Sequence, residues 1–215
     1  GKGEGLIIHA SDIAQTIASY ELVSKMRASF WVIGPLLARC GQARVSLPGG
    51  CAIGTRPVNL YLQGLKEMGA EIDVADGYVN AKALSPSGRL AGAQINFPFV
   101  SVGATHVMMM AASLADGQTI INNAASEPEI MDVGRCLQAM GAQIEGLGTR
   151  TLIIDGVEKL NGTTHTVTRD RIEAGAYACA VVASNGEVTL TGADEAMLGA
   201  LAPVLQQAGA KFETK

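Results

Sequence analysis

Apolar residues recur every three or four positions in three separate stretches of the chain, and each stretch closes with a similar phrase. The phrases are Leu-Lys-Glu-Met-Gly-Ala-Glu-Ile at 65–72, Leu-Gln-Ala-Met-Gly-Ala-Gln-Ile at 137–144 and Leu-Gln-Gln-Ala-Gly-Ala-Lys-Phe at 205–212. Their glycines, Gly69, Gly141 and Gly209, are 72 and 68 residues apart. A phrase that returns at a near-constant period indicates that one supersecondary unit has been duplicated.

Each stretch has the spacing of an amphipathic helix that stops at its glycine. A more apolar helix is predicted before each of them, at residues 27–40, 101–116 and 170–185. Strands are predicted at residues 43–47, 77–81, 119–122, 150–155 and 187–191, and residues 5–9 resemble one more strand. The predicted fold is therefore α/β, with repeated βαβαββ-type units. The pattern also suggests a piece cut from a longer repeat array.

The amino-acid composition indicates a globular protein and limits the kinds of partner it is expected to bind. The 215 residues are 48% hydrophobic, enough for a sizeable core, and only 17% charged, with a formal net charge of -4 and no stripe of Lys or Arg. Nucleic acid is therefore not an expected partner. The longest apolar stretch, residues 97–115, is interrupted by polar side chains and is shorter than a membrane span, so we expect a buried helix. No secretory leader is evident, which favours a cytoplasmic location.

The four cysteines lie far apart in sequence, without a Cys-x-x-Cys pair, which argues against a zinc site or a disulfide framework. Cys51 differs from the others because Pro48 and three glycines surround it, in a loop that leads to a predicted helix. A neighbouring cation such as Arg56, or a helix N-terminus, lowers the pKa of a thiol and makes it reactive. Cys51 is therefore a candidate reactive thiol, although an unreactive loop cysteine fits the same composition. Cys40, Cys136 and Cys179 fall in apolar helical patterns and are expected to pack.

Two arginines fall near the starts of predicted helices, where a cation is mildly unfavourable. Arg27 and Arg56 would make a strong site for a phosphate or carboxylate compound if the two helix starts converge, but two solvated arginines remain the alternative. Small residues at 100–105 would let a phosphate approach the start of another helix, a weak signal by itself. His106 and Trp31 are expected in the core, and His9 and His165 have no evident partner.

Several segments together resemble the UDP-N-acetylglucosamine enolpyruvyltransferase family. They are Met-Arg-Ala-Ser at 26–29, Pro-Gly-Gly-Cys-Ala-Ile-Gly-Thr-Arg-Pro-Val at 48–58, Val-Ser-Val-Gly-Ala-Thr at 100–105, Asn-Ala-Ala-Ser-Glu-Pro-Glu-Ile at 123–130 and Asp-Arg-Ile-Glu-Ala-Gly at 170–175. They occur in the family's order and the resemblance covers essentially the whole chain. The loop that carries Cys51 is its most specific part.

The resemblance implies a transferase of peptidoglycan synthesis that moves the enolpyruvyl group of phosphoenolpyruvate to the 3′-hydroxyl of UDP-N-acetylglucosamine and releases phosphate. It implies no metal and no organic cofactor. Cys51 would be the catalytic residue on a closing loop, able to bond phosphoenolpyruvate and alkylated by fosfomycin. Arg27 and Arg56 would hold the phosphate and the carboxylate. The UDP-sugar pocket would be lined by Arg56, Pro57, Val58, Asn59, Leu60, Ser101, Val102 and Gly103.

The same resemblance predicts helices on the inside and sheets on the outside of each domain, with residues 1–168 in the catalytic-loop domain and residues 169–215 starting the second. Six repeats make the whole family protein, so this chain would hold about half and have little activity without the remainder. Asn59 and Phe99 depart from the family's usual Asp and Lys. Transfer to shikimate 3-phosphate, or a non-catalytic fragment that binds a nucleotide sugar, are the alternatives.

Overall fold

The computed structural model describes residues 5–48 and 58–213, so Cys51, Arg56 and Pro57 lie outside the described residues. The chain divides into two compact units, residues 1–165 and residues 166–215, and each is described by itself. The assignment of residues 1–168 and 169–215 to the two domains of the family stays a prediction.

The first unit contains two copies of one element order. The first copy consists of β1 (Ile17–Ala18), α1 (Tyr20–Val23), the 3₁₀ helix η1 (Arg27–Val32), α2 (Ile33–Cys40), β2 (Gln42–Ser46), α3 (Asn59–Glu67), β3 (Ala70–Ala75) and β4 (Tyr78–Ala83). The second copy consists of β5 (Gln94–Asn96), α4 (Val102–Ala112), β6 (Gln118–Asn122), α5 (Pro128–Ala139), β7 (Gln143–Glu145) and β8 (Thr151–Asp155). The predicted βαβαββ order is confirmed in both copies.

Each copy builds one four-stranded sheet with the same topology. The strand orders are β1-β2-β4-β3 and β5-β6-β8-β7, in which the first two strands are parallel and the other pairs antiparallel. The register sets Val45 opposite Val79 in the first sheet and Ile121 opposite Leu152 in the second. All four side chains are fully buried, so both sheets turn an apolar face to the same core.

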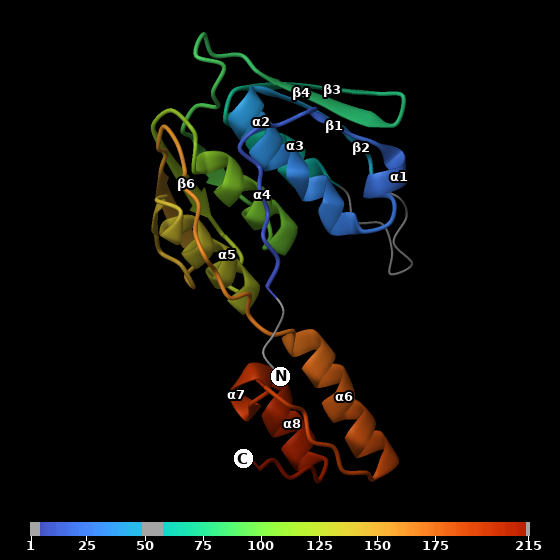
Figure 1. Cartoon of the computed structure of the whole chain (residues 1–215). Coiled ribbons are helices and arrows are strands. Elements are labelled where there is room, and N and C mark those ends of the chain that lie inside the picture. The colour runs from blue at the N-terminus through green and yellow to red at the C-terminus, as the bar shows by residue number, and fades with distance from the viewer. Residues whose placement is uncertain (1–4, 49–57, 214–215) are drawn as a thin grey trace. The chain divides into compact units, whose positions relative to one another are not determined.

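Within the first unit the helices lie between the two sheets, as Figure 1 shows for α2, α3 and α4. Burial agrees with this arrangement, because α4 is buried along nearly its whole length, including Val107, Met108 and Met109. A helix that is apolar on every side can be stable only when other elements surround it. The predicted arrangement of inner helices and outer sheets is confirmed in this unit.

Close glycine contacts show that three of these helices run parallel. A methyl group at Gly103, at the start of α4, would meet Trp31 and Tyr61, whereas methyl groups at Gly34 and Gly64 would meet Val107 and Met108. Moving one turn toward the C-terminus along η1–α2, or along α3, therefore moves the contact about one turn toward the C-terminus along α4. The starts of these helices consequently lie at the same end of the unit.

Helix α2 starts later than the predicted helix at residues 27–40, because residues 27–32 form a 3₁₀ helix instead. Pro35 has no N–H to donate to the preceding turn, and it is tolerated only in the first turn of an α-helix. The predicted strand at residues 5–9 is wrong: those residues are irregular, and Leu6, Ile7 and Ile8 are 76% to 83% exposed.

The second unit contains three helices among its described residues 166–213, namely α6 (Arg171–Ser184), α7 (Glu195–Leu198) and α8 (Leu201–Gln207). Asp170 caps α6 by accepting from the N–H groups of Ile172 and Glu173, 2.9 Å away in each case. The predicted strand at 187–191 is wrong, because that segment is irregular and no other described residue of this unit forms a strand to pair with it. No described helix is long and apolar enough to cross a bilayer.

Candidate functional site

The starts of α3, α4 and α5 lie beside one another in the first unit. The side chain of Tyr61, in the first turn of α3, reaches the α4 start at Gly103. From the segment before α5, the N–H of Ala125 donates to Thr105 Oγ1, 3.0 Å away. His106 Nε2 lies 3.4 Å from the carbonyl oxygen of Glu129 in α5. Three helix N-termini, each with a partial positive charge, are thus brought together.

Helix α4 offers two backbone N–H groups at this end. Ser101 caps the helix, since its Oγ accepts from the N–H of Ala104 at 3.3 Å and its carbonyl accepts from Thr105 at 3.0 Å. The N–H groups of Val102 and Gly103 precede the first helical hydrogen bond and have no partner within the helix. Because Gly103 lacks a Cβ, neighbouring groups can approach this backbone closely.

Helix α3 has the same kind of start but no side-chain cap. Its N-cap residue is Val58, whose carbonyl accepts from Tyr61 and Leu62 at 3.0 and 3.1 Å. The N–H groups of Asn59 and Leu60 are therefore at the uncapped end of the helix. Asn59 is exposed, Leu60 is half-buried and Val58 is buried. An anion is the natural ligand of such a start.

Of the predicted site residues, the structure brings together the members that lie on α3 and α4. These are Val58, Asn59, Leu60, Ser101, Val102 and Gly103. Arg27 opens η1, the element that carries Trp31 to the α4 start, and its side chain is half-buried. The predicted roles of Cys51, Arg56 and Pro57 fall outside the described residues.

A cluster of aromatic side chains supports the α4 start. The rings of Trp31 and His106 are stacked, with centroids 4.6 Å apart, and Phe30 meets Tyr61 edge to face at 5.8 Å. His106 is 3% exposed, as expected for a core residue, while Trp31 is only half-buried. Burial lowers the pKa of His106, although the carbonyl groups of Glu129 and Val102 and the carboxylates of Glu129 and Glu127 act in the opposite direction.

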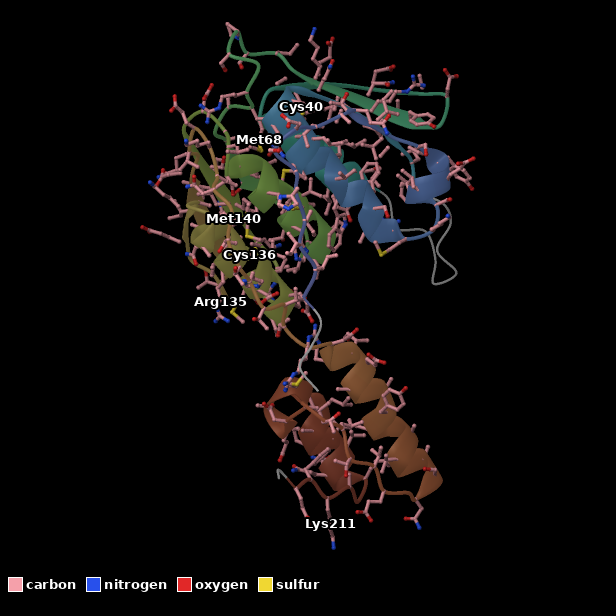
Figure 2. The ribbon with its side chains drawn as sticks, viewed as in Figure 1. Cys40, Met68, Arg135, Cys136, Met140 and Lys211 are labelled. Carbon is pink, nitrogen blue, oxygen red and sulfur yellow. The ribbon has the colours of Figure 1, made fainter. Side chains whose placement is uncertain are left out.

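The three described cysteines are free thiols, and they differ in exposure. Cys40 on α2 and Cys136 on α5 are labelled in Figure 2, and both are half-buried. Burial, and to a smaller extent the charge of Asp132, raises the pKa of the Cys136 thiol. This agrees with an unreactive packing residue. Cys179 on α6 is exposed, so the expectation that it packs in a core is wrong.

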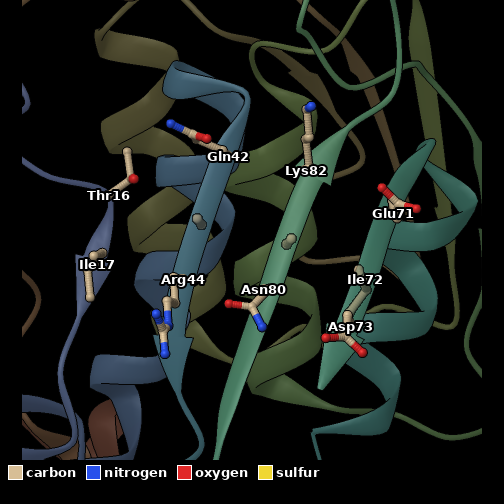
Figure 3. Close-up of a pocket in the computed structure, with 11 residues that line it drawn as sticks. Thr16, Ile17, Gln42, Arg44, Glu71, Ile72, Asp73, Asn80 and Lys82 are labelled. Atoms are coloured by element: carbon tan, nitrogen blue, oxygen red, sulfur yellow. The ribbon is translucent and has the colours of Figure 1, made fainter. Parts of the chain in front are cut away.

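A hollow lies elsewhere, on the outer face of the first sheet (Figure 3). Its volume is about 470 Å³, and charged side chains from three strands surround it, including Arg44, Glu71, Asp73 and Lys82. It is the open solvent face of a sheet, and no predicted site residue lines it. The start of α4 therefore remains the better candidate, because helix ends with N–H groups that have no partner within the helix meet the buried side chains of Thr105 and His106 there.

Comparison with known proteins agrees with the resemblance seen in the sequence motifs. The chain is 59% identical over 202 residues to UDP-N-acetylglucosamine 1-carboxyvinyltransferase of Rhizobium johnstonii, an alignment that covers 94% of this chain and 46% of that relative. It is 57% identical over 213 residues to the protein of the same name in Chelativorans sp., with 98% and 49% covered. The chain thus spans about half the length of the curated relatives it matches.

Solved structures support the same fold. The enolpyruvyl transferase NikO from Streptomyces tendae matches with a TM-score of 0.65 and 25% identity, over 80% of this chain and 39% of that chain. EPSP synthase from Acinetobacter baumannii matches with a TM-score of 0.55 at 22% identity, over 74% of this chain and 35% of that chain, which supports the fold alone.

The predicted fold class is confirmed by these neighbours. A family model described as EPSP synthase (3-phosphoshikimate 1-carboxyvinyltransferase) matches residues 2–215. The chain belongs to this family of enolpyruvyl transferases.

Proposed function

We propose that this chain is part of an enzyme that transfers the enolpyruvyl group of phosphoenolpyruvate to the 3′-hydroxyl of UDP-N-acetylglucosamine and releases phosphate. The observation that carries the proposal is the meeting of the α3 and α4 starts, which gathers Asn59, Leu60, Ser101, Val102 and Gly103. Both substrates are anions, and helix starts with unpaired N–H groups bind anions. Relatives at nearly 60% identity carry the corresponding enzyme name.

In the proposed reaction the sugar hydroxyl adds to the substituted carbon of the enol ester while a proton is added to the methylene carbon. Loss of phosphate from the substituted carbon and of a proton from the neighbouring methyl carbon then restores the double bond. Arg27 would hold an anionic group of phosphoenolpyruvate, together with Arg56 from the Cys51 loop. The N–H groups of Val102 and Gly103 would hold the nucleotide sugar. A cytoplasmic location stays a prediction.

The test measures which anion the chain binds. Isothermal titration of the chain with UDP-N-acetylglucosamine, shikimate 3-phosphate and phosphoenolpyruvate should give heat of binding with the nucleotide sugar and none with shikimate 3-phosphate. Release of phosphate from phosphoenolpyruvate is then followed with each acceptor present. Binding of shikimate 3-phosphate in place of the UDP-sugar would refute the proposal, and UDP-sugar binding without turnover would leave a nucleotide-sugar-binding fragment.

A further inference from the structure

Buried His106 has an arrangement of neighbours that the proposed function does not use. Its ring lies one turn into α4, stacked on Trp31, and it is 3% exposed. Nδ1 lies 3.1 Å from the carbonyl oxygen of Val102, and Nε2 lies 3.4 Å from the carbonyl oxygen of Glu129. The ring therefore spans from the first turn of α4 to the first turn of α5.

A neutral imidazole cannot satisfy both of these carbonyls, because it carries one N–H and one acceptor nitrogen. Only the doubly protonated ring donates to Val102 and to Glu129 at once. Its positive charge is costly in a buried position, so the free protein favours the neutral ring. An additional negative charge near the start of α4 would reduce that cost and favour uptake of the second proton.

The charged surroundings are otherwise mixed. At the start of α5, the carboxylates of Glu129 and of the N-cap residue Glu127 favour the charged ring. Arg27, on the η1 helix that carries Trp31, is a cation, and Arg150 donates to the carbonyl of Ala124 beside the α5 start. From α3, the side chain of Tyr61 lies at the α4 start beside Gly103. A bound anion would therefore be the element that changes the balance.

We propose that His106 is a positioning residue of the site at the α4 start and that it takes up a proton when an anion binds there. The imidazolium then donates to both carbonyls and fixes the first turn of α4, with the N–H groups of Val102 and Gly103, against α5. This rests on the proposed function for the identity of the ligand. The ring is one helical turn, about 5.4 Å along the axis, from the helix start, so it acts through α4 and not by touching substrate.

Proton uptake can be measured directly, because UDP-N-acetylglucosamine has no group that titrates near neutral pH. Titrations at pH 7 in two buffers with different ionisation enthalpies give the number of protons taken up on binding. The chain should take up a measurable fraction of one proton, and its Kd should fall as the pH is lowered, by at most about tenfold per pH unit. The same uptake in the His106→Phe variant, or none in the unaltered chain, would overturn the proposal.

Two variants distinguish the hydrogen bonds of His106 from its contribution to packing. His106→Phe keeps the stacking on Trp31 but has no N–H, whereas the amide of His106→Gln can donate to the Glu129 carbonyl. Neither variant should show proton uptake, but the glutamine variant should bind UDP-N-acetylglucosamine more tightly than the phenylalanine variant by severalfold. Equal affinities at equal thermal midpoints would contradict a positioning role.

A readout that needs no nucleotide sugar distinguishes failure of this inference from failure of the proposed function. Trp31 is the single tryptophan of the chain and stacks on His106, so its fluorescence should report protonation of the ring. If UDP-N-acetylglucosamine does not bind, the pH titration of Trp31 fluorescence is repeated with inorganic sulfate, which does not titrate in this range. A midpoint that moves to higher pH with sulfate, and is absent from His106→Gln, would support the inference. A midpoint that does not move would refute it.

Discussion

Arg89 lies in the connection between the two repeats of the first unit, and its replacement should loosen one repeat from the other. Its guanidinium donates to the carbonyl oxygens of Leu114 at 3.0 Å, Ala115 at 3.2 Å and Val157 at 2.8 Å. It also pairs with Asp116 at 2.5 Å, and its side chain is 28% exposed. The proposed site spans both repeats, so this tie affects the site as well as the fold.

The magnitude follows from these contacts. A hydrogen bond to a charged donor contributes about 1.5 to 3 kcal/mol to stability. Each bond of the partly exposed Arg89 side chain should contribute no more than the lower of these values, because water can replace the donor. The partly exposed ion pair adds less than about 1 kcal/mol. Arg89→Ala should therefore lower the free energy of unfolding by about 3 kcal/mol. Arg89→Lys should lose about 2 kcal/mol, because one ammonium cannot reach three carbonyls in the way a planar fork does.

Urea unfolding followed by Trp31 fluorescence measures this change, with circular dichroism as a second probe. A loss of about 3 kcal/mol corresponds to a fall in melting temperature of about 6 to 12 °C in a chain of this size. Arg44→Ala is the matched control, because Arg44 is exposed and its aromatic contact with Tyr78 contributes about 0.5 to 1 kcal/mol. If Arg89→Ala costs no more than this control, the inferred tie between the repeats is wrong.

Three further perturbations probe the α4 start. Ser101→Ala removes the cap of α4, so it should lower the free energy of unfolding by about 1 kcal/mol and weaken UDP-sugar binding in calorimetry. The control variant Asp194→Ala removes the cap of α7 in the other unit and should leave binding unchanged. Equal effects of the two variants on binding would contradict the site. Gly103→Ala places a methyl against Tyr61 and 3.0 Å from Trp31 Nε1, so it should destabilise by up to about 2 kcal/mol, after the gain in helix propensity is subtracted, and lose affinity. Adding Tyr61→Phe to Gly103→Ala should restore part of the lost stability and part of the lost affinity. A double variant that is no more stable and binds no more tightly than Gly103→Ala would argue against this contact. The pKa of His106 is lowered in the folded chain, so the unfolded chain binds a proton first as the pH falls, and the free energy of unfolding measured in urea should decrease below pH 6.5. The His106→Gln variant should lack this contribution of His106 to the pH dependence. An identical dependence of the free energy of unfolding on pH in both proteins would contradict the prediction.

Periodicity in the sequence predicted most helices and strands of the first unit, because each has a continuous apolar face that packs on the same core. The short first strands of each repeat, Ile17–Ala18 and Gln94–Asn96, were not located, since two or three residues carry no measurable alternation. The segment at 187–191 has strand-like composition but no strand partner among the described residues of its unit. Composition alone does not supply the hydrogen bonds that a strand needs.

The site was predictable in part. Small residues at 100–105 and the helix start predicted near Arg56 indicated two anion-binding ends, and the structure places the starts of α4 and α3 together. The cluster of Trp31, Tyr61 and His106 that supports the α4 start was not predicted. The three side chains come from three separate segments and meet only through the parallel packing of their helices. The pairing of His165 with Asp132, 3.1 Å apart, was not predicted either, because the two residues are far apart in sequence.

The most direct test of the proposed function is alkylation of the chain by fosfomycin, read by intact mass and peptide mapping, with and without UDP-N-acetylglucosamine. The proposal predicts a single adduct, on Cys51, that forms faster when the nucleotide sugar is present. Exposed Cys179 serves as an internal control for nonspecific reaction. Absence of a selective adduct on Cys51, or a rate that the nucleotide sugar does not change, would contradict the claim that these residues assemble the nucleotide-sugar site beside a reactive thiol.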